Sequence, residues 1–538
     1  MGSRWFASFH FLSGAWQIQG LLFVVGVFFA FALLVGYRTC FATFICWALA
    51  VSLNVRNPYI SAGGDVLLRA ILFWLMFLPS GGTFSVDRAW ASSDARIPKR
   101  VLSGATIAYA VQIVLLYWVS VLGKSGVEWR DGSAVYFALS IDYLSTPLGH
   151  WMLQLPPIML KLATWGVRFY EAIGPMLLFF PWFIGSIRTF VVFGFIALHA
   201  GFLTTLLIGI FPLVGIVSIL FFLPSWFWDN FLPTIATVLR KPIKIYYDKD
   251  CGFCWRTVQL LKTFVLSRES QIISVQSGPE TELGRSRCNS WRVVDGNGRE
   301  YSHFQGVVAI MRATPLTRCL MPLFGCVVIL KCEERLYRFV GEHRSGSSTQ
   351  PTTYIPRVDL NVHLSTCGNI AVTLFSLYVI AWNIFGLPQF PYKLSDRFRS
   401  IGELAGLDQN WDMFAPFPAK DNGWYVIPGR LQNGMEVDLF RSGGAPDWRK
   451  PKYISLEFKN HRWRKFMELV RKRPPLAASY AGYLCRDWNR SHSGGVSLKD
   501  LEIVYMLEWT RRDFAYFEPR KLSIFKFQCP PGTRQPAV

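Results

Sequence analysis

Two cysteines separated by two residues, Cys251 and Cys254, carry the clearest chemical signal in this 538-residue chain. They follow an apolar run at 243–248 and open an apolar-periodic segment, which predicts a strand, a tight turn and a helix. A C-x-x-C pair at a helix start can close a small disulfide ring, and the helix amides favour the thiolate of the first cysteine. The spacing therefore favours redox chemistry, with Cys251 attacking, Cys254 resolving, and Asp248 capping the turn or accepting a proton.

Two other interpretations of this cysteine pair stay open. The pair could be structural or chemically retired. It also makes half of a tetrahedral zinc site, but no second C-x-x-C and no histidine pair at ligand spacing supplies the other ligands, so we predict no metal. Most remaining cysteines are expected to be plain core residues, although one from the same block could act as a resolving thiol: Cys288, Cys319, Cys326 or Cys332.

The composition around the pair is that of a membrane protein. Charged residues make up only 17% of the chain, and three long stretches, 101–123, 189–225 and 364–392, carry none. Each could cross a hydrocarbon core, which takes about 20 helical residues. We therefore predict an integral, multi-pass membrane protein with about seven or eight spans. The predicted helices lie near 17–37, 39–55, 66–85, 102–123, 172–187, 189–208, 211–228 and 366–388.

Three details of these helices can also be predicted. Asp65 and Arg69 are one helical turn apart, where an ion pair would lower the cost of entering lipid. The last long apolar run of the first half should break near 209–212. The segment 150–170 contains two cations and could be a span, a re-entrant piece or an interfacial helix.

The chain divides into four segments: a bundle at 1–235, a soluble block at 242–350, a helix at 364–392 and a basic soluble block at 396–538. The second soluble block alternates as an antiparallel sheet does, with a hairpin turn at Gln432-Asn433-Gly434. These patterns predict a small α/β unit and a C-terminal α+β domain. Within the α/β unit we expect strand 243–248, helix 252–266, strands 271–276 and 290–295, and a helical stretch from about 304 to 340.

The string Tyr247-Asp248-x-x-Cys251-x-x-Cys254 resembles the signature of the DCC family of thiol-disulfide oxidoreductases. The later string Leu336-Tyr337-x-Phe339-x-x-x-His343-Arg344 is similar to the end of such domains. The resemblance implies a thioredoxin-like core and a protein dithiol or disulfide as substrate. Lys249 stands where the family usually has glycine, so the net effect of the charges at this turn on the thiolate stays open.

Several motifs in the first 230 residues, among them Arg56-Asn57-Pro58-Tyr59-Ile60, Leu68-Arg69 and His199-Ala200-Gly201-Phe202, resemble those of the HTTM membrane domain, which is related to vitamin K-dependent γ-carboxylases. This resemblance implies a quinone partner, although no cofactor is required for dithiol exchange itself. Ionisable groups in the bundle could shape a quinone site, foremost His199, Lys161 and Arg69, or they could only hold helices together. Lys161 could act as a base if it is desolvated. The resemblance is carried by Arg56-Asn57-Pro58-Tyr59-Ile60, Gly63-Gly64-Asp65, Arg130-Asp131-Gly132, Thr146-Pro147-Leu148-Gly149, Gly174-Pro175 and His199-Ala200-Gly201-Phe202, and by Gln409 to Pro416 after the last helix.

The net charge of the chain is +21, and the last block contains a dense group of basic residues. Its basic cluster could bind anionic lipid headgroups or be a solvated face, and no motif supports nucleic acid as a partner. Basic residues in the loop 86–100 and at the start of the α/β block favour a cytoplasmic location for both, which would put the last block on the opposite side, but this charge pattern does not fix the topology. The cluster comprises Lys450, Lys452, Lys459, Arg462, Arg464, Lys465, Arg471, Lys472 and Arg473.

Residues and resemblances together predict a polytopic α-helical membrane bundle with an inserted thioredoxin-like α/β domain and a C-terminal α+β domain. Three functions follow from this architecture. The chain could be a membrane-bound thiol-disulfide oxidoreductase, a γ-carboxylase-like enzyme with quinone-linked chemistry in the bundle, or a non-catalytic scaffold or transporter-like protein.

Overall fold

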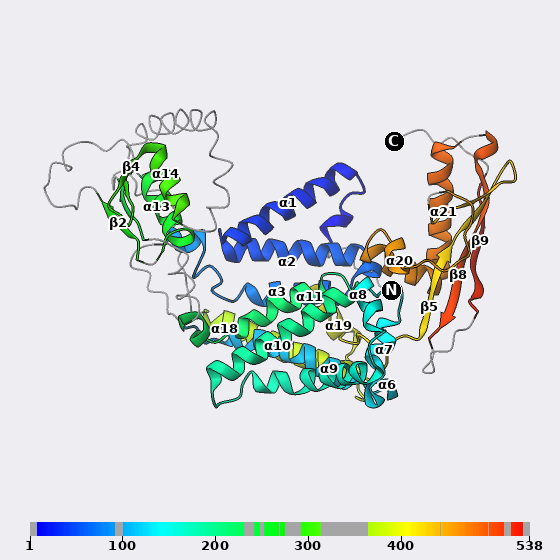
Figure 1. The fold of residues 1–538 in the computed structure, drawn as a ribbon, viewed down its shortest axis with the longest axis horizontal. Coiled ribbons are helices and arrows are strands. Elements are labelled where there is room, and N and C mark those ends of the chain that lie inside the picture. The colour runs from blue at the N-terminus through cyan, green and yellow to red at the C-terminus, as the bar shows by residue number, and fades with distance from the viewer. Residues whose placement is uncertain are drawn as a thin grey trace.

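The computed structural model describes residues 8–91, 100–230, 242–247, 252–267, 269–274, 292–313, 364–441, 443–492, 494–510 and 518–530. It is mostly helical, with a small α/β unit at one end of a helical bundle and an α+β unit at the other end (Figure 1). The predicted domain boundaries stay predictions.

Long helices form the central bundle and run back and forth between its two ends (Figure 1). Those long and apolar enough to cross a membrane are α1 (Trp16–Val35), α2 (Thr39–Arg56), α5 (Gly104–Gly123), α10 (Ile184–Thr205) and α18 (Thr366–Gly386). The remaining helices of the bundle are α3 (Gly63–Leu75), α9 (Pro157–Leu177) and α11 (Phe211–Ile219).

These five helices of the described residues are fewer than the predicted spans, because the other three are too short or too charged. The predicted helix at 172–187 is wrong. The segment 150–170 belongs mostly to α9, which continues through Pro175 to Leu177, and α10 begins only at Ile184, after Phe183 at a φ of 50°. The predicted break near 209–212 is confirmed between α10 and α11.

Short elements connect the helices of the bundle. They are η2 (Phe9–Phe11), η3 (Pro58–Ile60), α4 (Val86–Ala89), α6 (Val127–Asp131), α7 (Ala134–Leu139), α8 (Pro147–Met152) and η4 (Leu220–Phe222).

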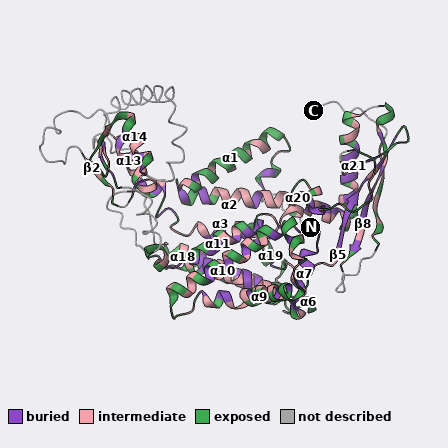
Figure 2. Ribbon diagram, viewed as in Figure 1, coloured by how far each residue is buried: buried purple, intermediate pink, exposed green. Residues whose placement is uncertain are grey.

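The bundle is packed inside and apolar outside. Trp74, Ile113, Phe195 and Ile219 are completely buried in its core. Along α1, by contrast, only Ala32 is buried, and the ribbon of this helix is mostly coloured exposed or intermediate (Figure 2). Its exposed residues include large apolar ones such as Leu21, Phe28 and Leu34. An exposed apolar belt of this kind would be unfavourable in water and suits a lipid environment.

The predicted ion pair between Asp65 and Arg69 is wrong. Each side chain is held by a partner from the C-terminal half instead: Asp65 accepts a hydrogen bond from Arg462 at 2.8 Å, and Arg69 donates one to Asp408 at 2.9 Å. Asp65 also accepts a bond from the Ala62 amide at 2.9 Å and so caps α3. Tertiary contacts thus replace the expected local pair.

The α/β unit has a four-stranded sheet with the order β2-β1-β3-β4. Strand β1 pairs with β2 in parallel and with β3 antiparallel, and β3 pairs antiparallel with β4. The described elements form a β-α-β unit, a hairpin and a helix. The first three predicted strands and the first helix are confirmed, and α14 confirms the start of the helical stretch predicted from about 304, whereas strand β4 was not predicted. Its elements are β1 (Lys244–Tyr247), α13 (Gly252–Phe264), β2 (Gln271–Ser274), β3 (Arg292–Val294), β4 (Glu300–Ser302) and α14 (His303–Arg312).

The C-terminal unit packs two helices on an antiparallel sheet, which confirms the predicted α+β arrangement. The predicted hairpin turn is confirmed, because Leu431 and Met435 pair across it and Gly434 has a φ of 86°. A disulfide, which the sequence did not reveal, joins Cys485 to Cys529. The elements are α19 (Asp396–Leu404), β5 (Asp421–Val426), β6 (Pro428–Leu431), β7 (Glu436–Asp438), η7 (Ile454–Glu457), α20 (His461–Lys472), α21 (Pro474–Ser491), η8 (Gly494–Val496), β8 (Leu498–Trp509) and β9 (Arg520–Gln528).

The buried amide of Gln409 fastens α18 and the following chain into the bundle. Its side chain exchanges two 2.9 Å hydrogen bonds with Gln112 of α5 and accepts a 3.2 Å bond from Asn383 of α18. Trp411 donates to the same oxygen at 3.1 Å. Because a buried polar group without a partner is costly, this network fixes the position of α18 against α5.

Replacing Gln409 should test this network. We expect Gln409→Ala to destabilise the bundle by about 1–3 kcal/mol for each amide left unpaired, since Gln112 and Asn383 stay buried. Thermal unfolding of the detergent-purified protein would measure the loss. Asn410→Ala is the matched control, because Asn410 is exposed and its side chain bonds Asp412 on the surface. Equal effects of the two variants would contradict the role of the network.

Candidate functional site

The dithiol segment lies where strand β1 leads into helix α13. Cys254 is in the first turn of α13 and is buried, in a small core with Ile245, Val258 and Val293. The neighbouring Phe253 is half exposed. Cys251 and Asp248 lie outside the described residues, so their predicted roles stay predictions.

The burial of Cys254 suits the role that the sequence predicts for it. A resolving thiol attacks only a sulfur of its own domain, so it needs no access to bulk solvent. An attacking thiol must reach a substrate and needs exposure. The burial of Cys254 is therefore compatible with its predicted role as the resolving thiol, which stays a prediction.

Helix α13 packs against α4 of the bundle. The Arg256 guanidinium lies 5.9 Å from the ring centroid of Trp90, which follows α4. A cation over an aromatic ring is attractive. The dithiol helix is thus held against the end of the bundle rather than only tethered to it.

Helix α4 is itself hydrogen-bonded to the turn between α1 and α2. The carboxylate of Asp87 accepts hydrogen bonds from the amides of Arg38 and Thr39, both at 2.8 Å, and from the Thr39 hydroxyl at 2.6 Å. It thereby caps the N-terminus of α2. A side chain at Gly36 would collide with Ser85 at 2.3 Å, so the close approach needs glycine there.

The three residues predicted to shape a quinone site are not joined to one another by any hydrogen bond or ion pair in the described part of the chain. His199 is buried on α10 and shares a 2.9 Å hydrogen bond with the Tyr117 hydroxyl. Arg69 is buried on α3 and bound to Asp408. Lys161 is exposed on α9, and its predicted role as a base stays a prediction.

The bundle also contains a buried ion pair that was not predicted from the sequence. Lys124 of the loop after α5 binds Glu171 of α9, and both side chains are almost inaccessible. The Lys124 ammonium lies 4.8 Å from the ring centroid of Trp129. Lys124 directly follows a charge-free helix in the sequence. Nothing in the sequence indicated that its side chain would be buried inside the bundle.

Much of the basic cluster binds carboxylates at the junction of the C-terminal unit with the bundle. Lys450 lies 2.7 Å from Asp142 and 2.6 Å from Glu508. Asp142 also accepts bonds from His150 at 2.9 Å and from Asn422 at 2.7 Å. The cluster is therefore in large part an internal interface. Further pairs are Arg462 with Asp65, Arg471 with Asp421, and Arg464 with Glu468.

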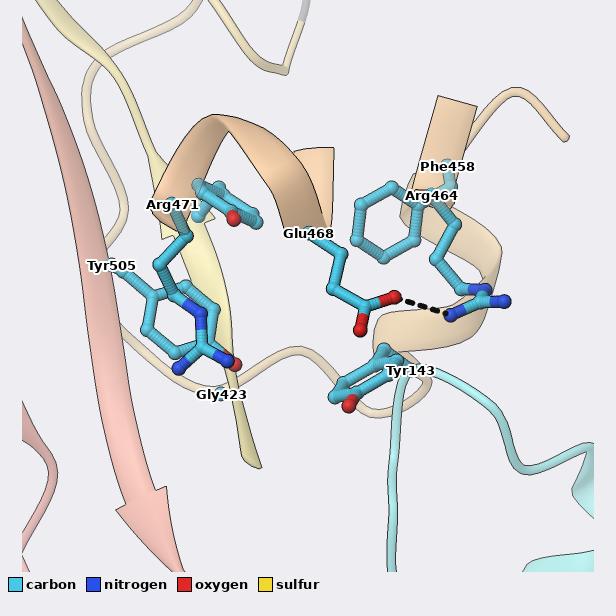
Figure 3. Close-up of a pocket in the computed structure, with 8 residues that line it drawn as sticks. Tyr143, Gly423, Phe458, Arg464, Glu468, Arg471 and Tyr505 are labelled. Atoms are coloured by element: carbon cyan, nitrogen blue, oxygen red, sulfur yellow. Dashed lines mark hydrogen bonds and ion pairs between the residues drawn. The ribbon is translucent and has the colours of Figure 1, made fainter. Parts of the chain in front are cut away.

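A cavity of about 20 Å³ lies at this junction (Figure 3). This volume can hold about one water molecule and no cofactor ring. The guanidinium of Arg464 lies over the Tyr143 ring, and that of Arg471 over the Tyr505 ring. We therefore interpret the cavity as part of the packing between the units. It is lined by Tyr143, Gly423, Tyr425, Phe458, Arg464, Glu468, Arg471 and Tyr505.

The α/β unit, with strand β1 and the helix α13 that contains Cys254, has a counterpart among known families. Residues 245–349 match the family model of DCC1-like thiol-disulfide oxidoreductases. The match supports the prediction that the chain is an oxidoreductase enzyme. No curated protein and no solved structure matches this chain.

The contact between His150 and Asp142 should make the junction sensitive to pH. The imidazole faces two acceptors, the Thr146 carbonyl at 3.0 Å and the Asp142 carboxylate at 2.9 Å, so both ring nitrogens are placed to donate. The hydrogen bond with Asp142 raises the pKa of His150 above its usual value, although burial opposes this. Burial acts to raise the pKa of Asp142, but hydrogen bonds from His150 and Lys450 lower it overall.

The stability that His150 contributes is complete below its unfolded pKa of about 6.5 and is lost as the pH rises through its raised native pKa. That of Asp142 is present above about pH 4 and is lost as the pH falls through its lowered pKa. We expect His150→Gln to cost about 1.5–3 kcal/mol near pH 6 and progressively less at higher pH. Thermal unfolding between pH 6 and 9 would measure this. Asn422→Ala removes a partner that does not titrate, so its cost should stay constant; a constant cost for His150→Gln would contradict the assignment.

Proposed function

We propose that this protein is a membrane-bound thiol-disulfide oxidoreductase whose α/β unit works at one end of an apolar helical bundle. The observation that carries the proposal is the position of Cys254 in the first turn of α13, directly after β1, within the segment that matches the oxidoreductase family. The sheet order β2-β1-β3-β4 is compatible with the thioredoxin-like core that the resemblance implies. The substrate class is a protein disulfide or dithiol.

In the proposed reaction, the Cys251 thiolate attacks one sulfur of a substrate disulfide and releases the other as a thiol. The Cys254 thiolate then attacks Cys251 in this mixed disulfide and releases the second substrate thiol. Two electrons and two protons pass from the enzyme dithiol to the substrate, and the enzyme keeps a Cys251–Cys254 disulfide. The partial positive charge at the N-terminus of α13 favours the thiolate, and Asp248 would cap the turn or accept a proton.

The bundle has two proposed tasks. The five apolar helices would hold the enzyme in a membrane as a multi-pass protein, surrounded by lipid. The contact of α13 with α4 would hold the dithiol close to that membrane.

Substitution of each cysteine in the full-length protein tests this function. Cys251→Ser should abolish disulfide reduction, because the attacking sulfur is gone. Cys254→Ser should instead trap a mixed disulfide with the substrate, since nothing resolves it. Insulin reduction and non-reducing mass analysis would measure the two effects. Cys367→Ser is the matched control, because Cys367 is an exposed thiol at the start of α18. Full activity of Cys251→Ser would rule out the proposal.

A quinone is the second candidate, as the electron partner of the dithiol. It is favoured by the buried pair of Tyr117 and His199, because the Nδ1 of His199 has no hydrogen-bond partner among the described residues. An unsatisfied buried nitrogen can bond a ligand oxygen. Gly215 leaves the imidazole its space, since a Cβ there would lie 2.3 Å from the ring.

The quinone candidate predicts a specific loss. Quinone-dependent oxidation of the dithiol should fall to background in His199→Ala, whereas insulin reduction by the same variant should stay. Stopped reactions with a soluble quinone, followed by thiol counting, would measure this. Thr204→Ala serves as the control, because Thr204 is exposed on the same helix. If the wild-type protein shows no quinone-dependent oxidation, the candidate fails.

A further inference from the structure

The two sulfur pairs of this chain belong to units at opposite ends of the bundle. The α/β unit with Cys254 packs on α4, beside the turn between α1 and α2. The C-terminal unit contacts the other end, where Arg462 binds Asp65 at the start of α3 and His461 lies 3.2 Å from the Leu207 carbonyl after α10 (Figure 1). If the helices cross a membrane, these two units lie on opposite sides of it.

A disulfide bond cross-links the C-terminal unit. Cys485 of α21 is buried and is bonded to Cys529, which follows β9, over a Cα separation of 5.8 Å. The bond closes a loop that contains β8 and fixes α21 on β9. Structural disulfides persist in oxidising compartments and are rare where cytosolic reductants act. The bond therefore points to an oxidising compartment for this end of the bundle.

The charges of the short loops indicate the same orientation of the two units, independently of the disulfide. At the α/β end, the described parts of the connections 36–38 and 76–103 contain Arg38, Arg88 and Arg100, and the sequence between residues 91 and 100 adds Arg96 and Lys99. At the C-terminal end, the loops 57–62 and 206–210 contain no basic residue, 124–156 contains Lys124 and Arg130, and 387–395 contains Lys393. Short loops rich in lysine and arginine stay in the cytoplasm.

From these two observations we infer that the α/β unit faces the reducing cytosol and the C-terminal unit faces the oxidising side of the membrane. This inference rests on the proposed function for its chemical consequence. In the cytosol the Cys251–Cys254 pair would be kept reduced, so the enzyme donates electrons rather than forming disulfides.

The substrate class is therefore a disulfide that is exposed on the cytosolic side, close to the membrane. Its disulfide bond breaks to two thiols while the Cys251–Cys254 bond forms. A cytosolic thiol reductant, glutathione or a reduced protein dithiol, must then break that bond and becomes oxidised itself. The reaction that precedes this enzyme is thus an oxidation of thiols at the cytosolic face, and the one that follows is re-reduction of its own dithiol.

A matched pair of cysteine reporters tests the orientation in the full chain. Asn297 and Asn433 are both exposed asparagines that precede a left-handed glycine in a hairpin turn, one in each unit. Asn297→Cys and Asn433→Cys are each introduced alone. Sealed membrane vesicles with the cytosolic face outward are treated with a membrane-impermeant maleimide polymer, and mass shifts are counted relative to wild type.

We expect Asn297→Cys to add one shift in sealed vesicles, and Asn433→Cys to add one only after detergent. The reverse pattern, or addition at both positions without detergent, would overturn the orientation. Insulin reduction that depends on Cys251 would be untouched by that failure, so it is distinguishable from a failure of the proposed function.

Trapping the thiols in living cells tests the direction of electron flow. Cells are quenched with acid, free thiols are alkylated, and peptides are identified by mass. The expected result is alkylated Cys251 and Cys254 together with joined Cys485 and Cys529 peptides. A predominantly joined Cys251–Cys254 pair would overturn the role as an electron donor, and alkylated Cys485 and Cys529 would remove the disulfide argument.

Discussion

The architecture depends on how one apolar helix, α18, is held inside the bundle. It is the segment that separates the α/β unit from the C-terminal unit, so its passage along α5 decides that the two units lie at opposite ends. Gln409 provides the polar contact that secures this passage, because its amide satisfies Gln112 of α5 and Asn383 of α18 together. In an apolar interior, a satisfied amide network specifies one arrangement more sharply than apolar packing alone.

Ion pairs at the junction between the bundle and the C-terminal unit add to the contacts that the Gln409 network makes. The carboxylates of Asp65 and Asp142 come from loops and helix ends of the bundle, and Arg462 and Lys450 come from the C-terminal unit. Partial burial makes the loss of either partner costly, since the remaining charge would stay desolvated. Two cations of the basic cluster, Arg462 and Lys450, are therefore explained by carboxylates of the bundle end that the last block contacts.

The sequence predicted the features that are set by local patterns. Charge-free runs gave α5 and α18 closely, and the Asn433-Gly434 turn gave a hairpin because only glycine adopts its φ without strain. Features set by distant contacts were missed. Asp65 and Arg69 looked like a local pair, yet each binds a residue more than 300 positions away. The partner of Cys485 could not be predicted either, because cysteine connectivity is not contained in spacing.

The proposed function requires that Cys251 and Cys254 form a dithiol able to reduce other disulfides. The reduction potential of this couple in the full-length protein tests it, obtained by equilibration in glutathione buffers and mass analysis of the Cys251–Cys254 peptides. We expect one two-electron couple between about −270 and about −200 mV, the range of dithiol reductants. A couple near about −120 mV, as in a strong oxidant, or no disulfide between these cysteines at any potential, would contradict it.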